Sequence, residues 1–351
     1  MKLMLVAGVG IALVLLGAFC AYAALPLRLP DPSGPHPVAS RPFPLTADRA
    51  DPTPIARLWY PGDGGTALPV LVYLPSWTGT SVEDRFLIGE LVSRGYVVLS
   101  LRWPTATEVA DAARDGRGLV PEAAGDMDFS SDAAFKASLD LADRKVRARA
   151  RTVSLALDAL TRLNQDPAGG FAHRLDLDQI GAWGFSLGGA GAAEAARHDP
   201  RIKAVANLDG WLFADAATDG VPCRYFLVGD GEGLPPADDL TALEPARRNG
   251  AILDRGDYDR QLAGLARHGG YMITIDGTSH LNFADVAVRS RLRRLAGTGS
   301  IDPRRGLVVT GAYLVGFFDA VLRGRPSPLL AAPSPLYPEV HLQVFSGDGR
   351  S

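Results

Sequence analysis

The sequence predicts a single α/β domain in which helices cover both faces of a mostly parallel sheet. Three observations lead to this fold class. Short apolar runs typical of buried strands alternate with segments of helical periodicity. Strands separated by helices pair in parallel, since each helix returns the chain to the same end of the sheet. The 351 residues, 47% of them hydrophobic, are also enough to bury one large core.

The expected elements alternate along the chain from residue 67 onward. The first strand, ALPVLVYLP at 67–75, is a continuous apolar run that ends in proline, as expected of a strand buried on both faces. The helix at 306–324 is amphipathic and contains Asp319, which argues against a membrane span. Further strands are expected at 96–102, 178–185, 202–209, 223–230 and 271–277, and further helices at 86–95, 146–163 and 186–198.

Three segments depart from this alternation. Residues 24–66 form a proline-rich lead-in that we expect to be extended, and residues 326–351 form a proline-rich tail. Residues 67–325, which lie between them, make up the expected domain. The polar, alanine-rich stretch at about 104–145 is a long insertion in that domain, and a cap or lid would lie there.

The first 23 residues have the pattern of a targeting segment. Lys2 is followed by an uncharged apolar run to Ala24 that ends in Ala-Tyr-Ala, the order found in secretory signal peptides. The run also approaches the length of a bilayer span, so an uncleaved N-terminal membrane anchor is the alternative. We therefore expect export to the periplasm or the extracellular space, or attachment to the membrane by this segment.

Charge and residue spacing exclude several kinds of site. The formal net charge of −3 gives no basic field that would hold nucleic acid. The six histidines and two cysteines show no H-x-x-x-H or C-x-x-C spacing, so we expect no metal site. Cys223, within an apolar run, is expected to be a buried packing residue.

The stretch GAWGFSLGGAG at 181–191 places one serine, Ser186, among glycines. GFSLG at 184–188 follows a predicted strand and opens a helix of small residues, the order that a nucleophile elbow needs. No G-K-[ST] follows, which excludes a phosphate-binding loop. The glycines also do not follow the first strand, as those of a dinucleotide-binding fold do. We therefore expect Ser186 to be a catalytic nucleophile.

A serine hydroxyl needs a base to take its proton, and the base needs an acid to orient it. In folds of this kind the serine precedes the acid and the acid precedes the histidine along the chain. His280, in DGTSHLNFAD just after a predicted strand, is the expected base, whereas His198 and His268 end helices and are expected to be surface or capping residues. The acid is left open between Asp209 and Asp230, each of which ends a predicted strand.

The segments GFSLGG, NLDGWLF and GTSHLNFAD together resemble the platelet-activating-factor acetylhydrolases, or phospholipase A2 group VII. Members of that family read G-H-S-F-G-G, L-D-A-W-M and H-Q-N-F-A-D around the serine, the acid and the base. The helix at 144–160 is also similar to the one before the elbow in that family. The resemblance spans about residues 67–324 and implies an α/β-hydrolase fold, with Ser186 as nucleophile, Asp209 as acid and His280 as base. Asp230 is the alternative acid.

The resemblance also implies where an oxyanion would bind. The loop after the first core strand reads H-G-L-G in the family and Pro-Ser-Trp-Thr-Gly at 75–79 here. The backbone N–H of Thr78, which matches the leucine of that loop, and the N–H of Leu187 are the expected donors. Trp77 replaces a glycine and is expected to narrow the acyl pocket, of which Phe185 and Trp211 form further walls.

These residues together predict a serine ester hydrolase that forms an acyl-enzyme intermediate and needs no cofactor. The resemblance implies phospholipids with short or oxidised sn-2 acyl chains as substrates. A general carboxylesterase, or a hydrolase of polyesters or dienelactone-like esters, is the alternative, and a non-catalytic binding protein is a further one. The basic run at 289–295 is either a contact to anionic headgroups at a membrane surface or a solvated helix face.

Overall fold

The computed structural model describes residues 27–45, 52–81, 84–289 and 297–347. The predicted targeting segment at 1–23 lies outside these ranges, as does all of the basic run at 289–295 except Arg289. In the described ranges, one helix, α8 (Pro303–Leu322), is long and apolar enough to cross a membrane, but 56% of its apolar window is buried within the protein. A core helix of a globular protein has the same properties.

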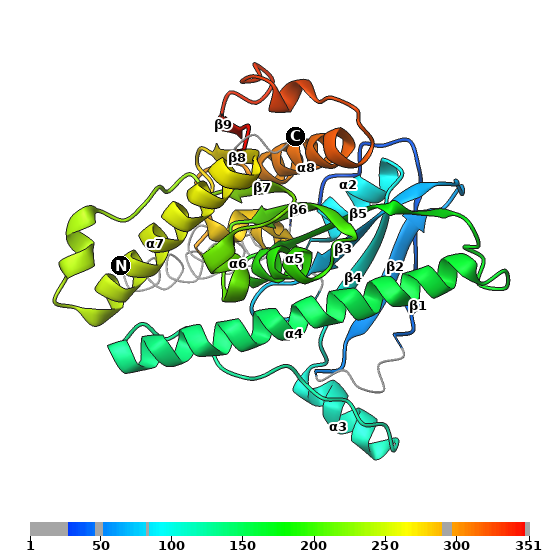
Figure 1. Ribbon diagram of the computed structural model, residues 1–351, viewed down its shortest axis with the longest axis horizontal. Helices are drawn as coiled ribbons and strands as arrows, with labels where there is room; N and C mark the ends of the chain where they lie inside the picture. Colours follow the sequence, from blue (N-terminus) through cyan, green and yellow to red (C-terminus); the bar gives the residue numbers. More distant parts are fainter. Residues whose placement is uncertain (1–26, 46–51, 82–83, 290–296, 348–351) are drawn as a thin grey trace, which may run out of the picture.

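Within the described ranges, nine strands form one sheet in the order β1-β2-β4-β3-β5-β6-β7-β8-β9 (Figure 1). The six central strands are parallel, and three flanking strands are antiparallel to their neighbours. This arrangement agrees with the predicted fold class. The central strands are β4 (Val97–Arg102), β3 (Leu68–Leu74), β5 (Leu175–Phe185), β6 (Ile202–Leu208), β7 (Arg224–Gly229) and β8 (Gly270–Ile275).

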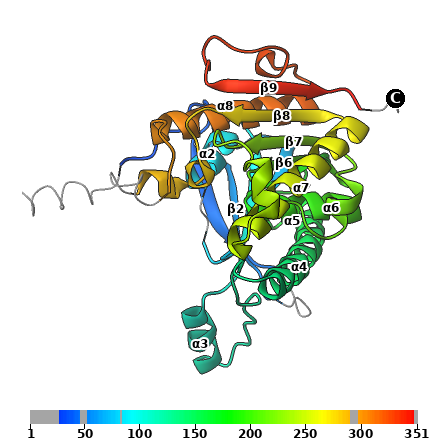
Figure 2. The ribbon, with the colours of Figure 1, turned by 90° about the vertical axis from the view of Figure 1, so that its left-hand side faces the viewer.

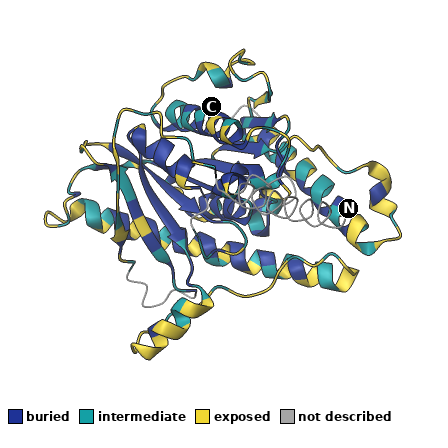
Figure 3. Cartoon of the chain, turned by 180° about the vertical axis from the view of Figure 1, so that it is seen from behind, coloured by how far each residue is buried: buried dark blue, intermediate teal, exposed yellow. Residues whose placement is uncertain are grey.

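Helices cover both faces of this sheet (Figures 1 and 2). Every residue of β3 is buried, because alternate side chains enter two separate cores. One core contains α2 (Arg85–Ser93) and α8, and the other contains α4 (Asp132–Gln165) and α5 (Leu187–His198). Figure 3 shows the buried residues concentrated in the sheet and on the helix faces that meet it. The shorter α6 (Ala214–Asp219) lies beside α5 and α4, and the longer α7 (Pro245–His268) lies beside α6 and α4.

The proline-rich lead-in and the proline-rich tail, for which no strands were predicted, contribute the antiparallel strands. The lead-in contains β1 (Val38–Phe43) and β2 (Ile55–Pro61), and the tail contains β9 (Val340–Phe345). The prediction of an extended lead-in without strands was therefore incomplete. The outermost strands β1 and β9 are largely exposed, so neither shows the continuous apolar run of a central strand.

The insertion at 104–145 has two parts that differ in position. Helix α3 (Ala106–Arg114) projects from the body of the protein, and only Ala112 of its residues is buried (Figures 1 and 2). After a connecting segment at 115–131, α4 begins at Asp132, well before the predicted start at 146. The buried residues in this early part of α4 are Ser138, Ala142 and Lys145, so its apolar periodicity is weak.

Candidate active site

Ser186 lies at the turn between β5 and α5, where its backbone has φ 56° and ψ −126°. A positive φ is strained for a residue with a side chain. The glycines on either side of Ser186 allow the turn, because a Cβ atom at either position would collide with the backbone. A Cβ at Gly188 would lie 2.1 Å from the carbonyl oxygen of Leu74, and one at Gly184 would lie 2.5 Å from that same oxygen. The turn therefore has the geometry of a nucleophile elbow.

The structure brings Ser186, His280 and Asp209 together from the ends of three strands. His280 Nε2 lies 3.1 Å from Ser186 Oγ, and His280 Nδ1 lies 2.7 Å from Asp209 Oδ2. A carboxylate only accepts, so Nδ1 carries the proton and Nε2 is left to accept from the serine hydroxyl. The His280 side chain is 45% exposed, which leaves its imidazole accessible from solvent.

Asp209 occupies a second tight turn, directly after β6, with φ 54°. The Asn207 amide holds this turn, because its Oδ1 accepts from the N–H of Gly210 and its Nδ2 donates to the carbonyl of Gly210. A Cβ at Gly210 would lie 2.1 Å from the carbonyl oxygen of Ser186. The turn that carries the acid is thus packed against the turn that carries the serine.

Asp230, the alternative acid, follows β7 and lies beside Asp209. Its N–H donates to Asp209 Oδ1 at 3.2 Å, and its own Oδ1 accepts from the N–H of Glu232. Burial, together with the neighbouring charge of Asp209, raises the pKa of Asp230 to about 6. The geometry therefore gives Asp209 the hydrogen bond to the imidazole and makes Asp230 a second carboxylate next to it.

Side chains of helix α7 support the turn that carries Asp209, and these side chains belong to no recognisable motif. Asp257 Oδ1 accepts from the N–H of Leu212, and Gln261 Nε2 donates to the carbonyl of Gly210. Asp254 Oδ1 accepts from the indole Nε1 of Trp211 at 2.8 Å. Sequence reasoning missed these residues because they lie more than 40 positions from Asp209, and only the fold associates them with the site.

The residues after His280 in the HLNFAD segment build the loop that carries the base. Asn282 Oδ1 accepts from the N–H groups of Ser279 and Gly299. Asp285 accepts from the N–H groups of Arg85 and Phe86, the first residues of α2. Burial raises the pKa of Asp285 to about 6. The motif therefore serves partly to hold the base loop against the start of α2.

The three predicted pocket residues have different environments. Trp77 and Trp211 are partly exposed and pack against one apolar cluster that includes Leu187. Phe185, in contrast, is only 3% exposed, and its ring lies 4.7 Å from the imidazole of His280. Phe185 therefore supports the base from within the core instead of forming an open pocket wall. Phe129, from the insertion, adds a ring 6.3 Å from that of Trp211.

The predicted oxyanion donors lie on two adjoining segments. Thr78 is exposed in the loop after β3, and Leu187 is the first residue of α5. Over the described ranges, no hydrogen bond within the protein uses the N–H of Trp77, Thr78 or Leu187. The first N–H groups of a helix have no partner within it and carry its positive dipole end, so they suit an anion.

Two other histidines are the last residues of α5 and α7. His198 bonds to Glu194 at 3.0 Å and lies 3.5 Å from Asp215, and these three residues are a possible set of metal ligands. Protein donors already engage this group, since Asp215 pairs with Arg147 and Glu194 accepts from a backbone N–H. His268 Nε2 lies 3.3 Å from the backbone carbonyl oxygen of Asp219, the last residue of α6.

Cys223, the cysteine within the described ranges, precedes β7. Desolvation raises the pKa of its thiol to about 12, so the thiol is neutral over the physiological range. Its sulfur also packs against the apolar core formed by α4 and α5. These contacts agree with the packing role expected from the sequence, but Cys223 is half-buried and not fully buried as expected.

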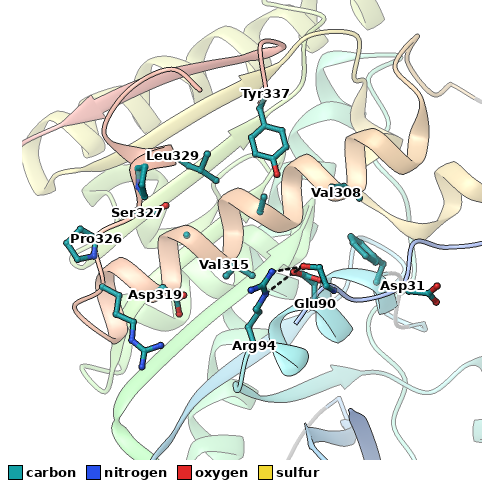
Figure 4. Close-up of a pocket in the computed structure, with 16 residues that line it drawn as sticks. Asp31, Glu90, Arg94, Val308, Val315, Asp319, Pro326, Ser327, Leu329 and Tyr337 are labelled. Atoms are coloured by element: carbon teal, nitrogen blue, oxygen red, sulfur yellow. Dashed lines mark hydrogen bonds and ion pairs between the residues drawn. The ribbon is translucent and has the colours of Figure 1, made fainter. Parts of the chain in front are cut away.

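A cavity of about 430 Å³ lies between α2 and α8 (Figure 4). The tail closes it with Leu329 and Tyr337, and Glu90 and Arg94 pair within it. None of Ser186, Asp209 and His280 lines this cavity. It is therefore separate from the candidate active site.

Comparisons with known proteins agree with this architecture. Residues 136–226 match a family model described as PETase: PET hydrolase-like, a range that includes Ser186 and Asp209. The solved structure of a ferulic acid esterase from Streptomyces cinnamoneus matches with a TM-score of 0.60 and 22% identity. The match covers 91% of this chain and 99% of that one. No curated protein matches.

The chain therefore has the α/β-hydrolase fold, with a serine, a histidine and an aspartate in contact at the carboxyl ends of its parallel strands. In all, 831 chains of solved structures match it, so the fold by itself does not determine the substrate. Neither the family model nor the esterase structure is that of a platelet-activating-factor acetylhydrolase. The coarser resemblance, to esterases of this fold, is the part that they support.

Proposed function

We propose that the protein is a carboxylic ester hydrolase in which Ser186 is the nucleophile, His280 the general base and Asp209 the acid. The observation that carries this proposal is the continuous chain of contacts Ser186–His280–Asp209 at 3.1 and 2.7 Å. The matches to a PET hydrolase-like model and to a ferulic acid esterase structure support the same class of reaction.

In the proposed reaction, His280 Nε2 takes the proton of the Ser186 hydroxyl as Oγ attacks the ester carbonyl. Asp209 stabilises the imidazolium that forms. The N–H groups of Leu187 and of the loop after β3 bind the oxyanion, each lowering the barrier by roughly 3 kcal/mol. His280 then returns the proton to the leaving alcohol, and a water molecule activated by the same base releases the acid from the acyl-serine.

We infer that the substrates are small or polymeric esters with an aromatic group. Trp77, Trp211 and Phe129 place aromatic rings around the apolar cluster next to Leu187. Offset stacking on such rings favours a planar group over a flexible lipid chain. The names of the matching family model and of the matching esterase structure favour the same substrates. Nothing in the comparisons favours phospholipids with short sn-2 chains, which serve as the contrasting substrates in the test.

The test is to measure kcat/KM of the purified protein on three esters: an alkyl hydroxycinnamate, a terephthalate diester and a phosphatidylcholine with an sn-2 acetyl group. We expect hydrolysis of an aromatic ester to exceed that of the phospholipid by roughly 10- to 200-fold. Ser186→Ala is expected to abolish all turnover. A preference for the phospholipid would overturn the substrate class, and turnover retained by Ser186→Ala would overturn the mechanism.

A further inference from the structure

Three buried charged side chains lie beneath the loop Pro75–Gly79. Arg149 is fully buried, Lys145 is 4% exposed and Glu122 is 5% exposed. Arg149 Nε and Nη2 bind the two carboxylate oxygens of Glu122 at 2.7 and 2.8 Å, and Lys145 Nζ lies 3.1 Å from Glu122 Oε2. The two cations come from α4, and the carboxylate comes from the connecting segment at 115–131.

The same two cations also bind the backbone of the loop. Arg149 Nη1 donates to the carbonyl of Pro75 at 2.6 Å and Nη2 to that of Ser76 at 2.9 Å, while Lys145 Nζ donates to that of Trp77 at 3.0 Å. In a trans peptide the N–H of the next residue points opposite to the carbonyl. The N–H groups of Trp77 and of Thr78 are therefore turned away from the cations.

The loop Pro75–Gly79 packs closely against the side chains of Arg149 and Glu122, which leaves it little room to move. Gly79 has φ 66°, and a Cβ there would lie 3.0 Å from both Arg149 Nη2 and Glu122 Oε2. The guanidinium of Arg149 also lies 4.7 Å from the ring centre of Trp103. Burying charged groups is costly unless they are fully paired, and an apolar core of the same shape would give comparable stability. An arrangement of this kind thus needs a reason other than stability.

We propose that Arg149, Lys145 and Glu122 are positioning residues for the oxyanion loop: Arg149 and Lys145 bind three successive carbonyls and so orient the N–H groups that receive the oxyanion, and Glu122 holds the two cations in place. The inference rests on the proposed ester hydrolysis. It gives the insertion a role in the reaction without placing it over the substrate, because Glu122 fixes the two cations that hold the loop.

The test compares Lys145→Met and Glu122→Gln with the wild type in two measurements. We expect kcat on the best ester to fall roughly 10- to 100-fold, with KM within about twofold, because the loss concerns the transition state. We also expect the backbone amide of Gly79, which donates to the carbonyl of Ser76, to exchange hydrogen faster in both variants. Asp199→Asn is the matched control: it breaks the ion pair between the buried Asp199 and the partly exposed Arg201 at the opposite end of the strands, and it is expected to lower Tm without changing kcat.

Folded Lys145→Met or Glu122→Gln protein with wild-type kcat would overturn the proposal, as would unchanged amide exchange in the loop. If neither variant folds, Arg149→Lys takes their place, because it keeps the charge but loses the fork that binds Glu122 and two carbonyls. The amide exchange does not depend on activity. A wild-type protein without Ser186-dependent hydrolysis would therefore refute the proposed function, while the exchange data would still decide whether these residues hold the loop.

Discussion

At the residue scale, the backbone is tightly constrained where the turn that carries Ser186 packs against the turn that carries Asp209. Both residues have positive φ, and Gly210 lies too close to the Ser186 carbonyl to carry a side chain. The sequence predicts the elbow, because G-x-S-x-G has a known backbone requirement. It does not predict that the two turns pack together, because that contact depends on the register between β5 and β6.

The choice between Asp209 and Asp230 could also not be made on spacing. Both follow adjacent parallel strands, and both carboxylates reach the same corner of the sheet. The geometry favours Asp209, which bonds to His280 Nδ1, but Asp230 contributes its charge. The supporting side chains on α7 escaped prediction because nothing in the helix sequence marks them as neighbours of the acid.

The raised pKa of Asp230 leads to a prediction on pH. Above pH 6 this carboxyl is ionised, and its negative charge favours the imidazolium that forms during the reaction. Below pH 6 the carboxyl of Asp230 is protonated, so it is neutral like the asparagine amide that replaces it in the variant. We therefore expect Asp230→Asn to lower kcat/KM roughly three- to tenfold at pH 8 and to match the wild type at pH 5.

Asp209→Asn is the comparison for this experiment, since removal of the bonded acid is expected to lower kcat on the order of 10⁴-fold at every pH. The measurement is the ratio of wild-type to variant kcat/KM across pH 5–9. A ratio for Asp230→Asn that stays constant over this range would contradict the assigned ionisation.

At the scale of elements, the prediction from sequence succeeded where helices and strands are buried. The central strands and helices α2, α5 and α8 lie within a few residues of their expected bounds, because apolar periodicity follows burial directly. Strands β1 and β9 escaped prediction because their exposed sides carry mixed residues. The first part of α4 escaped it because its buried face consists of small and charged residues, among them Lys145 beneath the loop after β3.

The two parts of the insertion are expected to respond differently to deletion. Glu108 of α3 pairs with Arg102 at 2.6 Å, and Ala112 is the buried residue of this helix. We expect replacement of residues 106–114 by a short glycine-serine linker to leave kcat within about threefold, because a partly exposed ion pair contributes roughly 1 kcal/mol or less. The measurement is kcat and Tm of the deletion protein. A loss of activity as large as that of Glu122→Gln would show that α3 also supports the site.

At the scale of the whole molecule, segments on either side of the parallel core form both edges of the sheet. Strand β9 pairs with β8 over its full length, and β8 leads into the loop of His280. We expect deletion of residues 335–351 to lower Tm and to cause aggregation, because it exposes the edge of an apolar strand. Tm and light scattering measure this. Deletion of 348–351 alone is the control, and equal behaviour of the two proteins would contradict the role of β9.

The directions of the two edge strands also determine how the fold would respond to mechanical load. In β9 the residue nearest the C-terminus, Phe345, pairs with Gly270, and in β1 the residue nearest the N-terminus, Val38, pairs with Pro61. A force applied at either end would therefore peel its edge strand one hydrogen bond at a time, which takes less force than shearing a whole strand. The serine, histidine and aspartate follow strands inside the sheet, so stretching the chain would remove both edges before it separated the three residues.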